Sequence, residues 1–493
     1  MTENKLTVNA NSKTIIESQV MESTDFSIGD NKRVLGMTAV AVITGYEALN
    51  NELRVAVRTI FRLTYQSEDG VMSAENKIDN VFSIYKEGIC ASSKACIKAT
   101  VADCEFTSGG KVKANATIEL SGWFLCENNM EFLDVCQDGV HCKSDAIKVE
   151  SVNLFDAKAI ALTNTFEARL PLAIILDSKA DAIITGVYPM NGSYQLEGEI
   201  IVRIVALSDT NQFISQNFSQ AFNTEITEAS VTADSIIDVE ASVKEVTLQL
   251  TDTDTRTIIC DISVAFCTAI NTQTEIMGLT DAYSTKSDLI MQSSCYKLNT
   301  NYCYRVARDK TSISYGFSQD INEICCLLSP MASAMVNTSE NTLMVEGLIT
   351  TTIVYLDEKN EFASSNVEIP YKVLVAKDFE CDLHLKPRVI VTNLSARLRA
   401  GREADITAEL LIWVRGVSSK EVCLISQMEV GGDKETDDYA ISLYIVKPNE
   451  NLWDVAKALN TEESTILELN KELKLPLKGG DRVMLYKPLN IDF

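Results

Sequence analysis

Residues 53–65, LRVAVRTIFRLTY, decide the fold class, because apolar and polar side chains alternate along them. A period of two places the apolar side chains on one face of an extended strand. Residues 196–206 (LEGEIIVRIVA) and 345–355 (VEGLITTTIVY) repeat the pattern, and both carry Glu-Gly at the same register. Each of the three stretches follows a polar turn. The sequence therefore predicts a long, half-buried strand at three places in the chain.

A β-hairpin pattern follows each of these strands at a similar distance. The three copies of the repeat start at residues 53, 196 and 345, about 143 and 149 residues apart, so the repeat is the size of a domain. Trp123 and Trp413 fall at equivalent places in the first and third hairpins, and the second has Phe266 nearby. The hairpins occupy residues 99–125, 241–267 and 391–416, and further alternating strands are expected at residues 76–87, 219–230 and 364–375.

The 493 residues are too many for one compact core, so several domains are expected. The predicted fold is mainly β, with three related sandwich-like domains followed by a small β-α-α-β domain. The expected divisions are an N-terminal extension at 1–35, β domains at 36–150, 151–290 and 291–432, and a C-terminal domain at 439–493.

The acidity of the chain limits its partners. The net charge is −25, and residues 439–493 are nearly neutral, with 7 Lys and Arg against 8 Asp and Glu. The acidic charge therefore belongs to the β-rich body, which repels phosphate backbones and anionic lipid headgroups. Nucleic acid and membrane insertion are not expected.

The N-terminus and the cysteines indicate a cytoplasmic location. The first residues show no basic segment followed by an apolar one, and no window reaches about 18 uninterrupted apolar residues, so neither a Sec signal nor a membrane span is expected. The 14 cysteines are irregularly spaced. In a reducing compartment most of them would be buried or exposed free thiols.

The hydrophobic period changes beyond the charged run GGDKETDDY at residues 431–439. Residues 451–460 place Leu452, Val455, Ala456 and Leu459 on one helical stripe, with Asn449 or Asn451 available as N-cap. A second short helix follows, for which Ser464 is the expected N-cap. Strands are expected at residues 443–446 and 482–486, on either side of the helices.

This C-terminal segment resembles a LysM domain. The residues that carry the resemblance are Tyr444, Val446, Leu452, Trp453, Val455, Ala456, Asn470, Gly480, Val483 and Leu485. LysM domains commonly bind N-acetylglucosamine polymers, and some bind proteins, through two loops. The resemblance places the binding site at Pro448, Asn449, Glu450, Asn451 and Leu452 in the first loop, and at Leu475, Pro476, Lys478, Gly479 and Gly480 in the second. The alternative for Leu452 and Trp453 is that they pack the small core.

Acidic β repeats followed by a C-terminal LysM domain resemble the spore-coat morphogenetic proteins with SPOCS domains, the SipL-like group of spore-forming clostridia. The SPOCS strand, which contains glycine and ends in Tyr, is matched by residues 345–355 and less well by 53–65. Residues 27–36, SIGDNKRVLG, lack the Pro-Asp stretch that precedes the first repeat in that group. The resemblance implies a protein of the mother cell that docks through its LysM domain to the coat-basement ATPase on the forespore surface.

Catalytic and metal sites are not expected, and no cofactor is implied. The only imidazoles are His141 and His384. Cys126, Cys136, His141 and Cys142 could supply zinc ligands, but their spacing fits no compact zinc motif. TDTDT at residues 251–255 lacks the glycine and distal glutamate of a calcium loop.

No phosphate-binding loop, nucleophile elbow or dinucleotide fingerprint occurs. The predicted function is therefore a non-enzymatic scaffold or adaptor in spore-coat assembly. Binding of peptidoglycan or another N-acetylglucosamine polymer is the alternative, and self-association through sheet edges is a third possibility.

Overall fold

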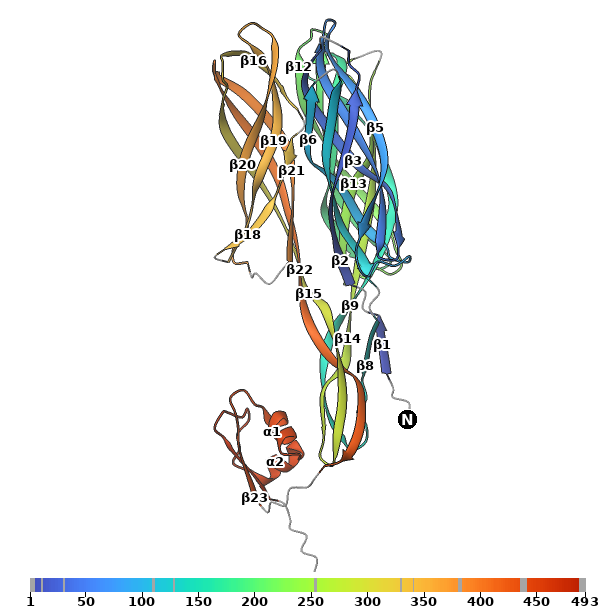
Figure 1. The fold of residues 1–493 in the computed structure, drawn as a ribbon, viewed down its shortest axis with the longest axis vertical. Coiled ribbons are helices and arrows are strands. Elements are labelled where there is room, and N and C mark those ends of the chain that lie inside the picture. The colour runs from blue at the N-terminus through green and yellow to red at the C-terminus, as the bar shows by residue number, and fades with distance from the viewer. Residues whose placement is uncertain are drawn as a thin grey trace, which may run out of the picture.

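The computed structural model describes residues 5–9, 12–29, 32–108, 111–126, 129–251, 255–328, 330–339, 341–379, 384–434 and 441–486. The molecule is long and almost entirely β. Three β-sandwiches lie together at one end, a narrow stalk extends from them, and the C-terminal helical module lies beside the far end of the stalk (Figure 1). The predicted fold class is confirmed.

The first sandwich packs two three-stranded antiparallel sheets face to face. Leu53, Val55 and Val57 of one sheet meet Ile118 and Leu120 of the other, so the alternating pattern buries one face of each strand. The sheets are β3 (Arg33–Leu49), β4 (Glu52–Ser67) and β5 (Gly70–Tyr85), and β2 (Ser12–Phe26), β7 (Val112–Cys126) and β6 (Ala95–Ser108), each in spatial order.

The second and third sandwiches repeat this plan. The second pairs β10 (Leu172–Met190), β11 (Ser193–Ser208) and β12 (Phe213–Thr227) with β13 (Ile236–Leu250), β14 (Thr257–Ser284) and β9 (Val140–Glu167). The third pairs β15 (Ser287–Gly316), β22 (Glu403–Asp433) and β21 (His384–Ala400) with a five-stranded sheet. That sheet comprises β16 (Ile321–Leu327), β17 (Met331–Ala332), β18 (Met335–Ser339), β19 (Thr342–Asp357) and β20 (Phe362–Ala376).

The repeated strand pattern marks equivalent strands in all three sandwiches. The stretches that start at residues 53, 196 and 345 lie in β4, β11 and β19, each flanked by partners on both sides. The predicted hairpins are β6–β7, β13–β14 and β21–β22, which pair antiparallel. Phe266 differs from Trp123 and Trp413 because it points into the core of its sandwich, after a bulge between Val264 and Phe266.

The stalk is built from the extensions of four long strands, which the sequence did not reveal. The strands β9, β14, β15 and β22 are 28 to 31 residues long, and each runs from a sandwich into the stalk. The short strands β1 (Lys5–Asn9) and β8 (Asn129–Leu133) pair beside them. Residues 136–179 and 279–329 supply much of these long strands. The proposed divisions between the β domains remain a prediction, and β9 passes through residues 150 and 151 without a break.

Most of the described cysteines are free thiols, as expected, but two disulfides were not predicted. Two pairs form disulfides in the stalk, Cys136–Cys142 and Cys295–Cys423, and eight other described cysteines are free. Cys295 and Cys423 lie directly opposite one another in the β15–β22 ladder. Their sequence separation is 128, so the pairing depends on a register that residue spacing does not reveal.

The C-terminal module has the predicted β-α-α-β order, with β23 (Ile441–Ile445), α1 (Leu452–Ala458), α2 (Glu463–Leu469) and β24 (Arg482–Tyr486). Asn451 caps α1, as one of the two predicted alternatives. The expected cap of α2 was wrong, because the helix begins one residue before Ser464 and its N-cap is Glu462. Within the described residues no helix is long and apolar enough to cross a membrane.

Candidate functional site

The core of the C-terminal module is small and apolar. Val446, Val455, Ala456, Ile466 and Val483 are buried, and Leu452 and Trp453 pack against them. The prediction that Leu452 and Trp453 fill the core is therefore confirmed. These side chains pack the two helices against one face of the β23–β24 sheet, and the other face of the sheet is left uncovered.

The first predicted binding loop, between β23 and α1, is held by its own side chains. The carboxylate of Glu450 accepts hydrogen bonds from the backbone N–H of Lys447 at 2.8 Å and from the hydroxyl of Tyr444 at 2.9 Å. The bond from Lys447 is the largest cause of the lowered pKa of Glu450. Asn451 and Asp454 form a reciprocal capping box at the start of α1. Asn449 has φ of 68°, a conformation that Asn tolerates well.

The second predicted loop meets the first. The backbone N–H of Gly480 donates to the carbonyl of Val446 at 2.8 Å, and that of Lys478 donates to the carboxylate of Asp481 at the same distance. A Cβ at Gly479 would lie 3.2 Å from Cα of Pro448, so the two loops are in close backbone contact. The structure thus brings the two predicted groups of site residues together.

Most of the ten predicted site residues are open to solvent. Glu450 and Leu452 are partly buried, and the other eight are exposed. Leu475 is an apolar side chain with 56% of its surface exposed, next to the positively charged Lys478. The loops contain no imidazole, thiol or pair of carboxylates. Their chemistry suits binding rather than proton transfer or metal ligation.

A wider apolar surface continues from these loops along the outer face of the β23–β24 sheet. In the antiparallel register Ile441 lies opposite Tyr486 and Leu443 lies opposite Met484, so these side chains share one face with Ile445. Their exposed fractions are between 38% and 60%. We call these five residues the outer sheet face. Contiguous exposed apolar side chains of this kind commonly mark a contact with another macromolecule.

Asn470, matched to the LysM pattern at the end of the second helix, has a structural role. Its side-chain amide donates to the carbonyls of Ile466 and Met484 at 2.8 Å, and its oxygen accepts from the N–H of Met484. The residue therefore fastens α2 to the edge of β24. It supports the module without forming part of the two loops.

The module is attached to the tip of the stalk by contacts that the sequence did not reveal. Asp281 of β14 accepts hydrogen bonds from the indole N–H of Trp453 at 2.8 Å and from Lys457 at 2.6 Å. Tyr283 packs with the module core, and its hydroxyl donates to the carbonyl of Thr461 at 2.9 Å. These contacts involve α1 and the turn after it. Within the described residues no hydrogen bond or ion pair joins either binding loop to the stalk.

His141 belongs to this attachment rather than to a zinc site. Its ring stacks on Tyr283 with centroids 5.0 Å apart, and its Nε2 lies 3.8 Å from a carboxylate oxygen of Glu462. The candidate ligands Cys136 and Cys142 are bonded to each other, and the side chain of Cys126 lies outside the described residues. No group of three or more metal-ligating side chains occurs among the residues that the structure describes.

Two other stretches, considered as sites from the sequence but not expected to be sites, are only partly described. His384 is the first residue of the strand β21, and its side chain lies outside the described residues. The TDTDT stretch lies in the β13–β14 connection, and residues 252–254 are outside the described residues.

Comparison with known proteins identifies the module. Residues 444–477 match the LysM domain family, a segment that runs from β23 through both helices and into the second loop. No curated protein and no solved structure matches the chain. The description of the β-rich body therefore rests on its own structure.

Proposed function

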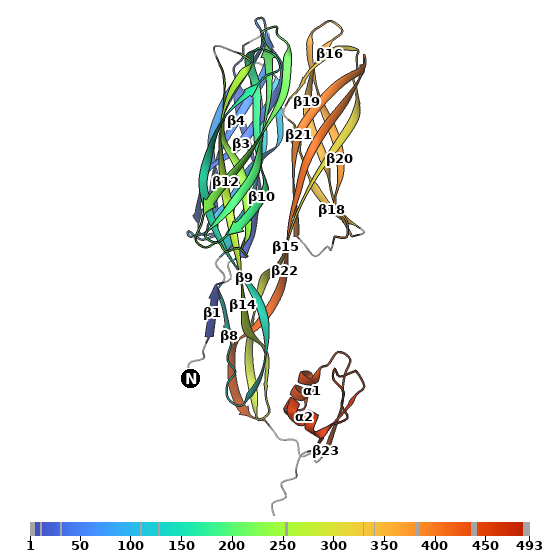
Figure 2. The ribbon, with the colours of Figure 1, turned by 180° about the vertical axis from the view of Figure 1, so that it is seen from behind.

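We propose that the chain is a non-enzymatic adaptor that binds a protein partner through its LysM domain, while the three sandwiches serve as a rigid acidic body. The binding surface consists of the two loops and the outer sheet face. The body holds this surface at one end of a long molecule, beside the tip of the stalk (Figure 2). Such a shape suits spacing or recruitment of other proteins.

The exposed apolar side chains of the outer sheet face are the observation that favours a protein partner. Ile441, Leu443 and Ile445 each expose more than half of their surface, and Ile445 directly precedes the first loop. Burial of apolar surface stabilises protein contacts by about 25 cal/mol per Å². A glycan chain, which presents many hydroxyl groups, would leave aliphatic side chains of this face without a matching partner.

Spore-coat assembly is the setting that the repeated architecture favours. Three acidic β repeats ahead of a LysM domain resemble the SPOCS-containing morphogenetic proteins, and the equivalence of β4, β11 and β19 supports a true repeat. In this setting the chain acts in the mother-cell cytoplasm at the forespore surface. Its LysM domain docks to the coat-basement ATPase or another coat protein.

Glycan binding is the second candidate, favoured by the match of residues 444–477 to the LysM family. The family binds its ligands through two loops, which here come into contact where Gly479 approaches Pro448. In this alternative the ligand is peptidoglycan or another N-acetylglucosamine polymer, and Leu475 and Lys478 would lie beside the sugar chain.

Two binding assays with the full chain separate the candidates. The probes are a lysate of sporulating mother cells, from which a coat protein should be recovered, and purified cell wall, with which the chain should not sediment. Leu443→Asp on the outer sheet face should abolish recovery of the coat protein. Leu467→Asp is the matched control, because Leu467 on α2 is also an exposed leucine.

The glycan alternative predicts a different outcome. The unmutated chain should sediment with cell wall, the Leu475→Asp and Lys478→Glu double variant should not, and no coat protein should be recovered. Equal recovery of the coat protein by Leu443→Asp and the unmutated chain would exclude the outer sheet face as the binding surface.

A further inference from the structure

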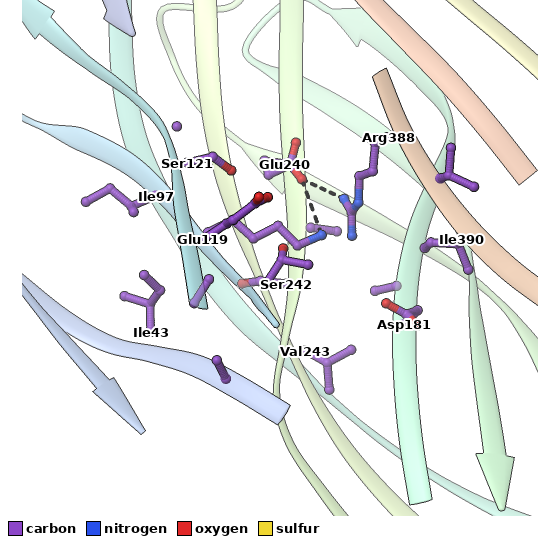
Figure 3. A pocket seen from close by; sticks show the side chains of 18 of the residues that line it. Ile43, Ile97, Glu119, Ser121, Asp181, Glu240, Ser242, Val243, Arg388 and Ile390 are labelled. Carbon is purple, nitrogen blue, oxygen red and sulfur yellow. Dashed lines mark hydrogen bonds and ion pairs between the residues drawn. The ribbon is translucent and has the colours of Figure 1, made fainter. Parts of the chain in front are cut away.

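A large cleft lies where the three sandwiches converge. Its volume is about 1520 Å³, and its walls come from β6 of the first sandwich, β10 and β13 of the second, and β21 of the third. Figure 3 shows Glu240 and Arg388 joined by an ion pair in this cleft, with Asp181 on a neighbouring strand. This volume exceeds that of a typical small-molecule site, so the cleft has room for a ligand with an extended body.

Apolar seams between the sandwiches fix the shape of the cleft. Leu35, Val205 and Leu328 come from three different sandwiches and pack in one buried cluster. A second seam joins the second and third sandwiches through Ile201 and Trp413, both of which also line the cleft. A cavity bounded by packed side chains of this kind keeps its geometry without a ligand.

The charge of the cleft is opposite to that of the molecule. Nine cationic and six anionic side chains line it, a net charge of +3 in a chain of −25. The cations are Lys13, Arg62, Lys98, Lys179, Arg203, Lys244, Lys386, Arg388 and Arg415, and the anions are Glu17, Glu119, Asp181, Asp238, Glu240 and Glu245.

Part of this charge is balanced by ion pairs that link the sandwiches. Glu240 accepts from Arg388 at 2.6 Å and from Arg415 at 2.8 Å, and Arg415 also reaches Asp238 at 3.0 Å. Burial raises the pKa of Glu240, but the nearby arginines outweigh this effect and leave the pKa lowered. These two carboxylates and two guanidinium groups neutralise one another.

The cations around Asp181 are not balanced in this way. Lys98 lies 4.0 Å from Glu240, at the limit of an ion pair, and Lys179 forms no ion pair within the described part of the chain. Arg203 is buried, and its one side-chain hydrogen bond in that part runs from Nε to Asn217. Burial lowers the pKa of Arg203 to about 10.

Lys98 is the most perturbed of these groups. Burial, followed by the nearby charge of Arg388, lowers its pKa to about 7. The pKa of Asp181 is lowered, since the attraction of Lys179, Lys98, Arg388 and Arg203 exceeds the opposing effect of burial. Lys98, Lys179 and Arg203, from the first and second sandwiches, therefore share Asp181, with further attraction from Glu240 on Lys98 and from Asp177 on Arg203. Desolvated positive charge of this kind is costly unless an anion joins it.

We propose that the cleft binds an organic phosphate, with the phosphate group among Lys98, Lys179 and Arg203 and the apolar part of the ligand against Ile201, Ile390 and Trp413. Guanidinium and ammonium groups are the donors that phosphate prefers, and a dianion removes most of the excess charge. Such a ligand bridges the sandwiches, so it stabilises their arrangement as well as occupying the cleft.

Calorimetric titration of the full chain with inorganic pyrophosphate tests this site. Saturable binding is expected at pH 6, with at least tenfold weaker affinity in Arg203→Gln and in Lys179→Gln. Lys386→Gln is the matched control, because Lys386 lines the same cleft but is paired with Glu17 at 2.7 Å. Circular dichroism shows whether each variant folds. If Arg203→Gln does not fold, the affinity of Lys179→Gln tests the site in its place.

The protonation of Lys98 gives a second readout. The anion favours the charged amine, so affinity should fall by about tenfold between pH 6 and pH 8, as Lys98 passes through its pKa of about 7. Lys98→Arg keeps its charge at both pH values, so it should lose the part of this fall that comes from Lys98. Any pH dependence that remains in this variant comes from titration of the pyrophosphate itself.

Vesicles that contain phosphatidylglycerol form the last arm, because a lipid headgroup offers the same phosphate chemistry as a free metabolite. Binding to vesicles alone, sensitive to Arg203→Gln, assigns the phosphate to a lipid, and binding to pyrophosphate assigns it to a soluble ligand. Absence of saturable binding in both arms, or binding that neither Arg203→Gln nor Lys179→Gln weakens, would overturn the proposed site.

Discussion

The indole N–H of Trp453 donates a 2.8 Å hydrogen bond to Asp281, and this contact ties the LysM domain to the tip of the stalk. Asp281 also accepts from Lys457, while the ring of Trp453 meets Tyr283 edge to face with centroids 4.9 Å apart. The family-matched Trp thus has two structural roles, one inside the module core and one at its attachment. Among the described residues, this attachment does not involve hydrogen bonds or ion pairs of the two binding loops.

Removal of the Asp281 carboxylate should release the module. A hydrogen bond to a charged group contributes roughly 1.5–3 kcal/mol, so Asp281→Ala is expected to reduce the equilibrium constant for docking by at least about tenfold. Hydrogen–deuterium exchange should accelerate in peptides that cover α1 and residues 281–284. Asp288→Ala is the control, because Asp288 is exposed at the same end of the stalk. Unchanged exchange in Asp281→Ala would show that the other contacts, those of Tyr283 and His141, hold the module without it.

Acid should weaken the same attachment. Burial raises the pKa of Asp281, but the hydrogen bonds from Lys457 and Trp453 outweigh it and leave the pKa below its ordinary value. A lowered pKa in the docked state gives stability that is present above the undocked pKa, about 3.9 for Asp, and is lost as pH falls through the docked value. Protection factors of the α1 amides, which correct for the intrinsic pH dependence of exchange, should therefore be high at pH 6 and fall below about pH 4. The Asp281→Ala variant should not show this fall.

The repeated Glu-Gly strands owe their glycine to close packing of the neighbouring strand. A Cβ at Gly198 would lie 2.5 Å from the carbonyl oxygen of Ile183, and one at Gly347 would overlap the carbonyl oxygen of Ser333. Gly198→Ala and Gly347→Ala should each destabilise the protein by about 1–3 kcal/mol. Gly45→Ala is the control, since a Cβ there meets nothing within 4 Å.

Thermal unfolding of purified protein measures this difference. Melting temperatures should fall for Gly198→Ala and Gly347→Ala and stay near the unmutated value for Gly45→Ala. An equal fall in all three variants would mean that the glycines act through backbone freedom rather than through packing.

The two disulfides should differ in their effect on the stalk. The chain-entropy estimate for oxidised protein is on the order of 4–5 kcal/mol for a loop as long as that closed by Cys295–Cys423, and about 2 kcal/mol for the short loop of Cys136–Cys142. Cys423→Ala should therefore lower the melting temperature of the stalk more than Cys142→Ala does. Peptide mapping without reductant should recover residues 295 and 423 in one cross-linked species. A larger effect of Cys142→Ala would contradict this order.

The local patterns predicted the parts of the fold that depend on neighbouring residues. Alternation along residues 53–65 predicted β4, and the change to a helical stripe at Leu452 and Val455 predicted α1. The two loops came together as the LysM pattern implied, because the end of β23 pairs with the start of β24, which brings Pro448 and Gly479 to the same end of one small sheet. These features follow from periodicity and from family-specific positions.

The features that depend on distant pairing could not be predicted in the same way. Cys295 and Cys423 look like incidental thiols until the β15–β22 register places them opposite one another. Asp281 is one of many acidic residues, and only the fold brings it to Trp453. The cation cluster of the cleft is likewise assembled from three sandwiches. No spacing in the sequence marks such groups, because tertiary contacts alone define them.

Localisation of the full chain during sporulation tests the central claim most directly. A fluorescent fusion of the unmutated chain should form a ring around the forespore, as should the Leu467→Asp control. Leu443→Asp should leave the fusion diffuse in the mother cell at an equal protein level. A ring that persists in Leu443→Asp, or an unmutated chain that never gathers at the forespore, would contradict a LysM domain that docks this adaptor to a coat protein.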